Sequence, residues 1–474
     1  MKQNGCYIDL HAHLDGSVTV DIAKKLAALQ NIALPMDNDE ELLALLSVPD
    51  SCESLNDFLQ CFELPGRLMQ TPEGLQNAVT LVLENMAQDG VIYAELRFAP
   101  QFHTLGGMTQ EQAVQAAVAG LKNAPIPGNL ILCCMRGEGN EKANEETLAL
   151  AKKYLVKDHG VTAMDLAGAE ALFPTVNYLG LFEEAKEAGI PYTIHAGEAD
   201  GPESVRTAIQ TGTKRIGHGV RSMEDEAVME LIREKGITLE MCPTSNRQTH
   251  AILDMKQYPL VRFLESGIRV TVNTDDMGIE RTCLSKEFDY LKREFGLTEE
   301  QQKQVLLNAT DAAFAGMDIV LGAAENDIAE RFAPAIVRSG AVFVDNSSAF
   351  RLDPNVPLVV PEINAGDVKL HHGIISNPNC STIITLTAIN ALRKLSPIRD
   401  MVVSTYQAVS GAGAGGPIEL QNEVDALRAG KSYAPKVFAH QIAYNVIPQI
   451  GGEQCDGYTS EEMKLQNEGR KILH

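Results

Sequence analysis

The segment GIPYTIHAGE at residues 189–198 is a short apolar run that ends at His195 and Glu198. Its β-branched and aromatic residues, bounded by glycine and proline, predict a strand. In enzymes built on a ring of parallel strands, catalytic groups lie where the strands end. A core histidine with satisfied hydrogen bonds beside a helix-capping glutamate would give the same local pattern. The rest of the chain decides between these two interpretations.

Seven further apolar segments have the character of strands, and segments with helical spacing of apolar residues separate them. The eight predicted strands cover residues 7–14, 91–98, 130–135, 161–168, 189–198, 215–218, 237–242 and 268–275. Predicted helices include residues 17–29, 39–46, 71–87, 179–188 and 298–315. Alternation of this kind over about 270 residues is typical of a (β/α)8 barrel, the TIM barrel.

An open, doubly wound sheet is the alternative arrangement of the same elements. Such a sheet normally binds its ligand at one topological switch point. Here polar residues follow strands one, four, five, six and eight, and only a closed sheet brings those five ends together. The sequence therefore favours an α/β protein with a barrel in residues 1–315 and a second, incomplete α/β domain in residues 316–474.

The composition is that of a globular protein with a large core, with 45% hydrophobic and 22% charged residues in a chain of 474. Its formal charge of −23, from 40 basic and 63 acidic residues, would repel a nucleic-acid backbone. No apolar leader opens the chain and no run of about eighteen apolar residues follows, so we expect no membrane association and a cytoplasmic location. Nine cysteines without a C-x-x-C pair predict reduced thiols, with Cys133 and Cys134 buried in a strand.

His11 and His13 stand two residues apart in the first predicted strand, where residues i and i+2 share a face. Two imidazoles on one face can reach one metal ion, although packed or solvated histidines are a common alternative. His195 of strand five and Asp275 of strand eight complete a set of three imidazoles and one carboxylate. Such a set can hold one zinc ion and leave a position for water. Zinc lowers the pKa of that water and makes hydroxide available near neutral pH.

Three further polar residues lie at the ends of the same strands. Glu198 follows His195 by three residues and could carry protons beside the metal. His218 and Asp276 could orient the hydroxide through hydrogen bonds. Each has a structural alternative, namely helix caps for Glu198 and Asp276 and a backbone-bonded core histidine for His218.

Six motifs in chain order resemble the signature of the adenosine deaminases. They are HAHLDG at 11–16, MDLAGAE at 164–170, TIHAGE at 193–198, IGHG at 216–219, CPTSN at 242–246 and NTDD at 273–276. The resemblance implies zinc-dependent hydrolysis of adenosine and 2′-deoxyadenosine to inosine and ammonia in purine salvage. It implies metal ligation by His11, His13, His195 and Asp275.

The same resemblance implies that Glu198 protonates the purine ring nitrogen while His218 and Asp276 position the hydroxide. It places Asp15 at the ribose and Gly168 at the purine, with His13 and Asp276 also next to this small-molecule substrate. Related two-metal hydrolases often carry a lysine after strand four, where this chain has DLAG at residues 165–168, so we expect one zinc ion per barrel. Adenine deaminases have similar metal motifs and are the alternative, but DLAG resembles the adenosine branch.

Residues 316–474 resemble aspartate-semialdehyde dehydrogenase through VDNSSAFR at 344–351, SNPNCS at 376–381, VSTYQAVSGAG at 403–413 and EEMK at 461–464. The resemblance makes Cys380 a thiol nucleophile at a helix start, where the helix N-terminus stabilises a thiolate. An inert helix-start cysteine is the structural alternative. The family pattern also assigns phosphate to Arg351 and Lys464, substrate to Gln407 and Glu461, and the cofactor's edge to Ser410 and Gly411.

This second segment departs from the dehydrogenase pattern in two places. The glycine-rich turn for the dinucleotide would lie before residue 316, and the catalytic histidine and second substrate arginine would follow His474. GAGAGG at 411–416 fits G-x-G-x-x-G after a predicted strand, but no suitable second strand or acidic residue follows, so we do not assign it to phosphate. His440 lies in an apolar stretch and is expected to be packed or to cap. We therefore expect no productive NADP binding and no dehydrogenase activity.

The purpose of residues 316–474 stays open at this point. A fusion remnant, an interaction or dimerisation module that forms a homodimer, and the product of joined reading frames all fit the sequence. The hypothesis that competes with an enzyme is a catalytically dead chain whose second segment is an interaction module.

Overall fold

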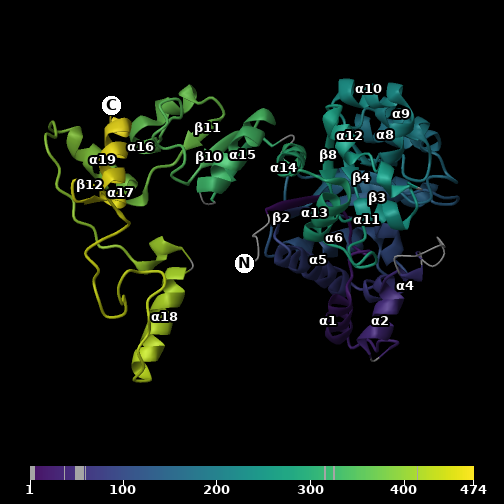
Figure 1. Cartoon of the computed structure of the whole chain (residues 1–474), viewed down its shortest axis with the longest axis horizontal. Coiled ribbons are helices and arrows are strands. Elements are labelled where there is room, and N and C mark those ends of the chain that lie inside the picture. The colour runs from purple at the N-terminus through teal and green to yellow at the C-terminus, as the bar shows by residue number, and fades with distance from the viewer. Residues whose placement is uncertain are drawn as a thin grey trace. The chain divides into compact units, whose positions relative to one another are not determined.

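The structure is a computed structural model that describes residues 6–36, 38–48, 58, 60–252, 254–313, 317–323, 326–413 and 415–473. The chain divides into two compact units, Met1–Gly316 and Met317–His474, and each is described by itself (Figure 1). The expectations for residues 1–5, for a boundary between residues 315 and 316 and for His474 concern positions outside the described residues.

Eight parallel strands form the centre of the first unit. They are β1 (Tyr7–His13), β2 (Val91–Phe98), β3 (Gly128–Met135), β4 (Val161–Ala167), β5 (His195–Ala196), β6 (Arg215–His218), β7 (Thr238–Met241) and β8 (Arg269–Val272). Neighbours in the chain pair with one another, in the orders β1-β2-β3-β4 and β5-β6-β7-β8. All six of these pairings are parallel.

Two parallel bridges join these half-barrels into a ring. Met164 of β4 bridges Tyr192, and Ala12 of β1 bridges Asp275 just after β8. The (β/α)8 barrel is therefore confirmed, and the open doubly wound sheet is excluded because both edges of the strand array are paired.

The fifth strand is much shorter than residues 189–198, and that prediction is wrong in extent. Pro191 has no amide hydrogen to donate to a ladder, and the hydroxyl of Thr213, rather than a strand amide, donates to the Tyr192 carbonyl at 2.8 Å. Gly197 then ends the strand with a φ of 72° in the left-handed region. Before β5, the segment is still joined to β4, because the Met164 amide donates to the Pro191 carbonyl and the Thr193 amide donates to the Met164 carbonyl, both at 3.0 Å.

Helices surround the strands of the first unit (Figure 1). They are α1 (Val20–Gln30), α2 (Asp39–Leu46), α4 (Glu63–Leu68), α5 (Pro72–Gln88), α6 (Gln110–Leu121), α7 (Glu141–Tyr154), α8 (Leu179–Glu187), α9 (Pro202–Thr211), α10 (Glu226–Lys235), α11 (Pro243–Gln248), α12 (Leu260–Glu265), α13 (Leu284–Phe295) and α14 (Glu299–Ala313). The first begins at Val20 rather than at Ser17, because the Thr19 side chain accepts from the Ile22 amide and caps the helix there.

The apolar core of the first unit lies between its strands and helices. Leu96 of β2 and Leu132 of β3 belong to one buried cluster with Val82 of α5 and Val114 of α6. The last helix, α14, packs across the closure of the barrel against β8 and β1. Cys133 and Cys134 are buried in β3 as predicted, and the cysteines described by the structure form no disulfide.

A three-stranded parallel sheet in the order β11-β10-β9 forms the centre of the second unit. The elements are β9 (Ile319–Gly322), α15 (Asn326–Arg338), β10 (Val342–Asp345), α16 (Pro361–Asn364), β11 (Ile374–Ser376), α17 (Cys380–Arg393), α18 (Gly415–Arg428), β12 (Glu453–Cys455), β13 (Tyr458–Thr459) and α19 (Ser460–Leu473). The sheet is small, as expected for an incomplete α/β domain.

Two sequence expectations fail in this unit. The strand predicted before GAGAGG is not formed: residues 401–408 are irregular backbone, and a short 3-10 helix, Val409–Ala412, includes the first two residues of the segment. His440 is exposed in irregular backbone rather than packed, because its apolar neighbours along the chain do not form a buried element. Among the described residues of the whole chain, no helix has both the length and the apolar character needed to cross a bilayer.

Candidate active site

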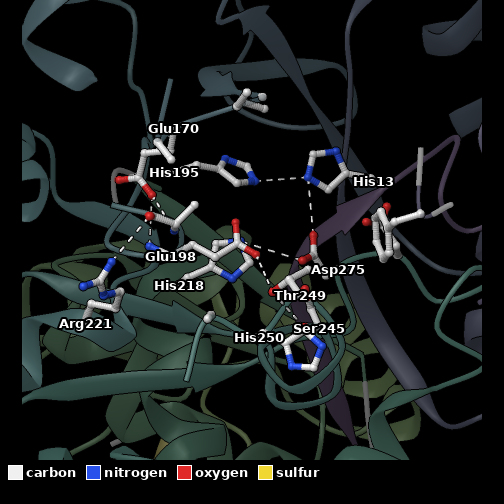
Figure 2. Close-up of a pocket in the computed structure, with 18 of the residues that line it drawn as sticks. His13, Glu170, His195, Glu198, His218, Arg221, Ser245, Thr249, His250 and Asp275 are labelled. Atoms are coloured by element: carbon white, nitrogen blue, oxygen red, sulfur yellow. Dashed lines mark hydrogen bonds and ion pairs between the residues drawn. The ribbon is translucent and has the colours of Figure 1, made fainter. Parts of the chain in front are cut away.

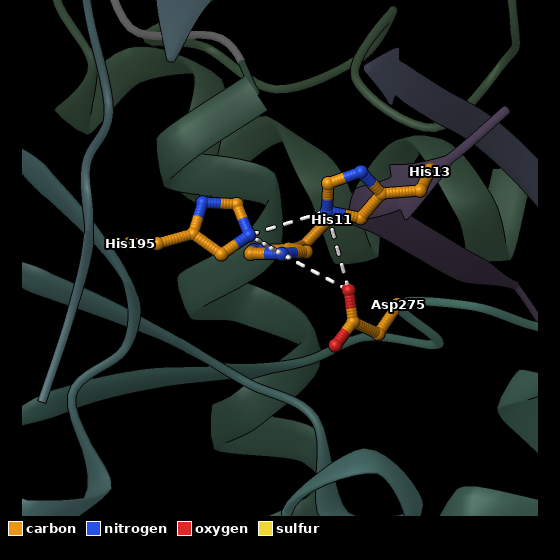
Figure 3. A group of neighbouring side chains, drawn as sticks. All are labelled: His11, His13, His195 and Asp275. Atoms are coloured by element: carbon orange, nitrogen blue, oxygen red, sulfur yellow. Dashed lines mark hydrogen bonds and ion pairs between the residues drawn. The ribbon is translucent and has the colours of Figure 1, made fainter. Parts of the chain in front are cut away.

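Four side chains from three parts of the barrel converge at the carboxyl ends of the strands (Figure 3). His195 Nε2 lies 3.1 Å from His11 Nε2 and 3.2 Å from His13 Nε2. The Asp275 carboxylate oxygen Oδ1 lies 3.3 Å and 3.4 Å from the same two nitrogens of His11 and His13. The sequence predicted that these four residues meet, and the structure brings all four together.

The chemistry of this group fits a metal ion. Four ligands at about 2.0–2.1 Å from a tetrahedral zinc ion lie about 3.3 Å from one another. The observed separations of 3.1–3.4 Å match that spacing. Three Nε2 atoms and one carboxylate oxygen that face a common point therefore form a candidate metal site within the described residues.

Buried carboxylates fix the orientation of two of these imidazoles. Glu240 Oε2 lies 2.9 Å from His11 Nδ1, and Asp165 Oδ2 lies 2.9 Å from His195 Nδ1. Each carboxylate favours the tautomer whose proton is on Nδ1, which leaves the lone pair on Nε2 for a metal. Burial alone would raise the pKa of Asp165, but His195 and Arg97 hold it well below its usual range.

A buried arginine joins these two carboxylates. Arg97 has 0% exposure, and its guanidinium donates to Asp165 at 2.8 Å and to Glu240 at 2.9 Å. It also donates at 2.7 Å to the carbonyl of Leu10, the residue directly before His11 in β1. Arg215 pairs with Glu240 from the other side, so the barrel interior holds a continuous charged network beneath the candidate metal site.

The sequence interpretation gave no role to Asp165, Glu240 or the two arginines. A signal was present, because Asp165 and Glu240 each stand as the one charged residue of a mainly apolar strand, and Arg97 shares such a strand with Glu95. Charged residues almost never lie fully buried without partners, so such residues predict paired charges inside the barrel. Their partners could not be read from one sequence, because they come from strands up to 229 residues apart.

Glu198 lies on the loop that follows β5, beside the candidate metal site (Figure 2). Its Oε1 accepts from the Thr249 hydroxyl at 3.1 Å, and its Oε2 lies 3.5 Å from His218 Nε2. Burial, the charge of Asp275 and the charge of Glu170 together raise the pKa of Glu198 to about 8. The carboxyl group therefore keeps its proton at neutral pH, as a general acid requires.

His218 and Asp276 complete the polar wall of the site. His218 is buried, its Nδ1 faces the Asn246 amide at 3.0 Å, and its Nε2 lies 3.7 Å from Asp275 Oδ2. Burial lowers the pKa of His218 well below its usual value, so the ring is neutral. Asp276 is also buried, and its Oδ1 has no hydrogen-bond partner among the described residues.

Both His218 and Asp275 have a positive φ, at 59° and 58°. A non-glycine residue in the left-handed region is uncommon and costs energy, and such residues cluster at functional sites.

Burial and the charge of Asp275 raise the pKa of Asp276 well above its usual value. Asp276 therefore holds its proton more readily than an ordinary aspartic acid, and it has an unsatisfied oxygen inside the site.

A cavity of about 1010 Å³ opens over these residues. Phe58, Phe62 and Phe102 supply apolar wall, and Asp15 and Gly168 lie in the lining as the substrate prediction requires. Burial raises the pKa of Asp15 to about 6. The predicted residues His13, Asp15, Gly168, His195, Glu198, His218, Asp275 and Asp276 all line this one cavity.

In the second unit, several predicted dehydrogenase residues lie around the start of α17. Cys380 is the first residue of that helix and is exposed. Glu461 accepts from Asn379 at 3.0 Å and from Gln407 at 3.5 Å, and it pairs with Lys464 at 3.4 Å. Ser410 and Gly411 lie in the exposed 3-10 helix described above.

Arg351 occupies a different environment from the other predicted phosphate residue. It is buried, and its guanidinium donates to the Asn377 carbonyl at 2.9 Å, to the Asn346 carbonyl at 2.9 Å and to Glu468 at 3.2 Å. The Arg351 guanidinium thus holds three parts of the second unit together. Lys464, in contrast, is partly exposed, and among the ion pairs of the described residues it pairs only with Glu461.

Comparisons with known proteins divide the chain close to the boundary between its two compact units, Met1–Gly316 and Met317–His474. Residues 7–325 match the family described as Adenosine deaminase, and residues 389–474 match the family described as Semialdehyde dehydrogenase, dimerisation domain. Adenosine deaminase of Haemophilus ducreyi is 48% identical over 313 residues, which cover 65% of this chain and 91% of that protein.

Solved structures give the same picture of the fold. The crystal structure of adenine deaminase from Arthrobacter aurescens is 25% identical, covers 70% of this chain and 98% of that chain, and has a TM-score of 0.59. An amidohydrolase structure from Burkholderia ambifaria, described with bound Zn, is 23% identical, covers 65% of this chain and 85% of that chain, and has a TM-score of 0.57. The latter likeness concerns the fold alone.

Proposed function

The chain belongs to the adenosine deaminase family, and from that membership we propose that its barrel is a zinc-dependent hydrolase of adenosine and 2′-deoxyadenosine. The reaction adds water to the amine-bearing carbon of the purine, breaks the carbon–nitrogen bond and releases inosine and ammonia. One observation carries the proposal: three imidazole nitrogens and one carboxylate converge on one point, and three of these four residues line the same cavity as a protonated glutamic acid.

His11, His13, His195 and Asp275 are the proposed ligands of one zinc ion per barrel. Zinc held there would supply a water molecule with a pKa near neutrality. Glu240 and Asp165 keep His11 and His195 in the tautomer that can ligate. Arg97 holds both carboxylates in place from below.

Glu198 is the proposed general acid. It donates its proton to the purine ring nitrogen as hydroxide adds to the neighbouring carbon, and its pKa of about 8 provides that proton at neutral pH. The Thr249 hydroxyl, which donates to Oε1, fixes the orientation of the Glu198 carboxyl group.

His218 and Asp276 are proposed to position the attacking hydroxide. The neutral His218 ring accepts at Nδ1 from Asn246, so its Nε2 carries a proton that faces Asp275 and the cavity. The free oxygen of Asp276 can accept or donate one further hydrogen bond, and a substrate that fills the cavity would supply its partner.

Asp15 and Gly168 are proposed to select the nucleoside. Asp15 lines the cavity and can accept from a ribose hydroxyl, and Gly168 leaves room for the flat purine. Free adenine is the competing substrate, because the chain is also similar to an adenine deaminase structure. That similarity, at 25% identity, is lower than the 48% identity to the adenosine deaminase relative.

For the second unit we propose a homodimer interface rather than a dehydrogenase, with no productive binding of NADP. The dimerisation family described above supports this, as do strongly exposed apolar side chains such as Leu395 at 85% and Val402 at 98%. Light scattering of the purified full chain tests this part: a mass of two chains is expected, and a monomer at every concentration would contradict it.

The test of the enzymatic proposal is the loss of adenosine ultraviolet absorbance with the purified, metal-replete chain. We expect turnover that a chelator removes and that zinc restores. A competing assay with free adenine is expected to give much slower turnover, and faster turnover of adenine would move the proposal to that substrate.

A further inference from the structure

Glu170 lies on the loop after β4 and is almost completely buried, at 2% exposure, yet the reaction described above gives it no task. We propose that Glu170 is a positioning residue for Glu198: its carboxylate binds the backbone of the loop that carries the general acid and holds that loop in its working conformation. This inference rests on the proposed deaminase function and adds a residue to it.

The carboxylate of Glu170 accepts hydrogen bonds from four consecutive backbone amides. Its Oε1 accepts from Gly197 N at 2.7 Å, and its Oε2 accepts from the amides of Glu198, Ala199 and Asp200 at 3.1, 2.9 and 3.1 Å. The second of these amides belongs to the general acid itself. Figure 2 shows Glu170 next to this loop, with Glu198 directed from it toward Asp275.

Successive amides that point inward make a concave site for an anion. Here the left-handed φ of Gly197 turns the chain so that the four amides face one point. A side chain at Gly197 would also meet Val205 at 2.4 Å, so the close packing of loop and α9 fixes the same turn. Because β5 has only two residues, the sheet ladder does not satisfy these amides, and a buried amide without a partner is costly.

A second chain of hydrogen bonds ties this arrangement to the metal ligand His195. The Ser204 hydroxyl of α9 donates to Glu170 Oε1 at 2.6 Å and lies 2.8 Å from Thr175 Oγ1. Arg136 donates to Thr175 at 3.0 Å and to the His195 carbonyl at 2.7 Å. The carbonyl of His195 and the amide of Glu198 are thus held by one connected network.

Glu170 also acts on Glu198 through its charge. It contributes to the raised pKa of Glu198, after burial and the charge of Asp275. The geometry carries the inference, and the charge works in the same direction because it favours the protonated form of the acid.

The change Glu170→Gln tests this role with little change in volume. An amide has one accepting oxygen, so one orientation turns its NH2 group toward three backbone amides and the other toward one amide and the Ser204 hydroxyl. We expect kcat to fall on the order of 10²-fold, as small misplacements of catalytic groups do. The KM for adenosine and the bound zinc are expected to stay at wild-type values.

A double-mutant cycle separates positioning from a general structural defect. Glu170→Gln is made in the wild type and in Glu198→Gln, and turnover of the slow variants is measured at high enzyme concentration over long incubations. If Glu170 acts only through Glu198, replacing Glu170 should lower turnover little further once Glu198 has been replaced. The same fold loss in both backgrounds, or lost zinc with unchanged kcat per bound zinc, would overturn the inference.

Glu419 provides a matched control within the same chain. It is also 2% exposed, and its carboxylate accepts from the amides of Lys436, Val437 and Phe438, but it lies in the second unit. Glu419→Gln should leave deamination unchanged. If Glu170→Gln does not fold, Ser204→Ala removes one hydrogen bond to the same carboxylate and should show a smaller kcat loss with the same dependence on Glu198.

The wild-type assay distinguishes the two levels of the account. No turnover by the metal-replete wild type would contradict the proposed function and, with it, this role of Glu170. Normal wild-type turnover with an unaffected Glu170→Gln variant would contradict the positioning role alone.

Discussion

The amide of His13 donates to the Asp275 carbonyl at 2.8 Å, and this bond is part of the closure of the barrel. The Asp275 amide donates in turn to the His11 carbonyl at 2.8 Å. Closure of the barrel between β1 and the segment after β8 thus fixes the backbone positions of three of the four proposed metal ligands, namely His11, His13 and Asp275. Their side chains need no separate element to bring them together.

Glu198→Gln should separate ligation from proton delivery. Glu198 is not among the four converging ligands, so the variant should bind zinc normally while kcat falls by about 10²–10⁴-fold, the usual contribution of a general acid. Elemental analysis of zinc and steady-state turnover on the same preparation measure both effects. His195→Ala should lose both zinc and turnover, and release of zinc by Glu198→Gln would contradict the assigned role.

Turnover should fall as the pH rises through about 8. The pKa of Glu198 is raised to that value, so its acidic form predominates below it and the carboxylate above it. Only the acidic form can donate the proton, so kcat/KM should show a basic limb in that region. A profile of kcat/KM that stays flat well above that pH would show that another group delivers the proton.

Arg97→Met should weaken both the fold and the metal site. The substitution leaves Asp165 and Glu240 buried without their shared partner, which costs about 3–5 kcal/mol for a broken buried pair. Loosened orientation of His11 and His195 should lower zinc affinity by about 10–100-fold. Urea denaturation and chelator competition measure the two effects.

The exposed pair of Arg233 with Glu230 provides the control for that experiment. Arg233→Met should change stability by less than about 1 kcal/mol, because surface ion pairs contribute little. Equal effects of the two substitutions would contradict the role given to the buried network.

Asp15→Ala should reduce the preference for the nucleoside. If Asp15 accepts from a ribose hydroxyl, kcat/KM for adenosine should fall by about 10²-fold, whereas the already slow turnover of adenine should hardly change. Parallel assays with the two substrates give the ratio. An equal fall for both would place Asp15 in the chemistry or in folding rather than in recognition of the sugar.

The second unit should not produce NADPH from NADP, phosphate and aspartate semialdehyde. Cys380 starts its helix as predicted, but Arg351 is already bonded to Glu468 and two carbonyls, and the sequence of residues 316–474 does not have the pattern of a complete nucleotide-binding unit. Absorbance of NADPH with the isolated full chain is the measurement. Turnover that Cys380→Ser abolishes would contradict this expectation.

The barrel could be predicted because its signals are local. Apolar runs such as residues 91–98 and 161–168 appear as strands in place, and helix starts such as Pro72 follow from residues within one turn. The fifth strand was overestimated, because periodicity does not show that Gly197 ends it or that the segment before it pairs with β4 only through the single bridge at Tyr192. In the second unit, residues 401–408 have the composition of a strand but no neighbouring strand to pair with.

The four converging ligands were found because they lie in short motifs, but their supporting residues were not. Glu170 stands inside the quoted motif MDLAGAE, yet its task depends on amides about 30 positions later in the fold. Arg97 and Glu240 come from strands that are neighbours only through the closed barrel interior. Such contacts follow from the fold and not from any pattern within one segment.

The most direct test of the central claim is deamination of adenosine by the purified full chain, with zinc measured on the same sample. We expect about one zinc per chain, as a site of four protein ligands requires, and turnover of adenosine to inosine that is proportional to bound zinc. A chain that carries its zinc and leaves adenosine unchanged would contradict it.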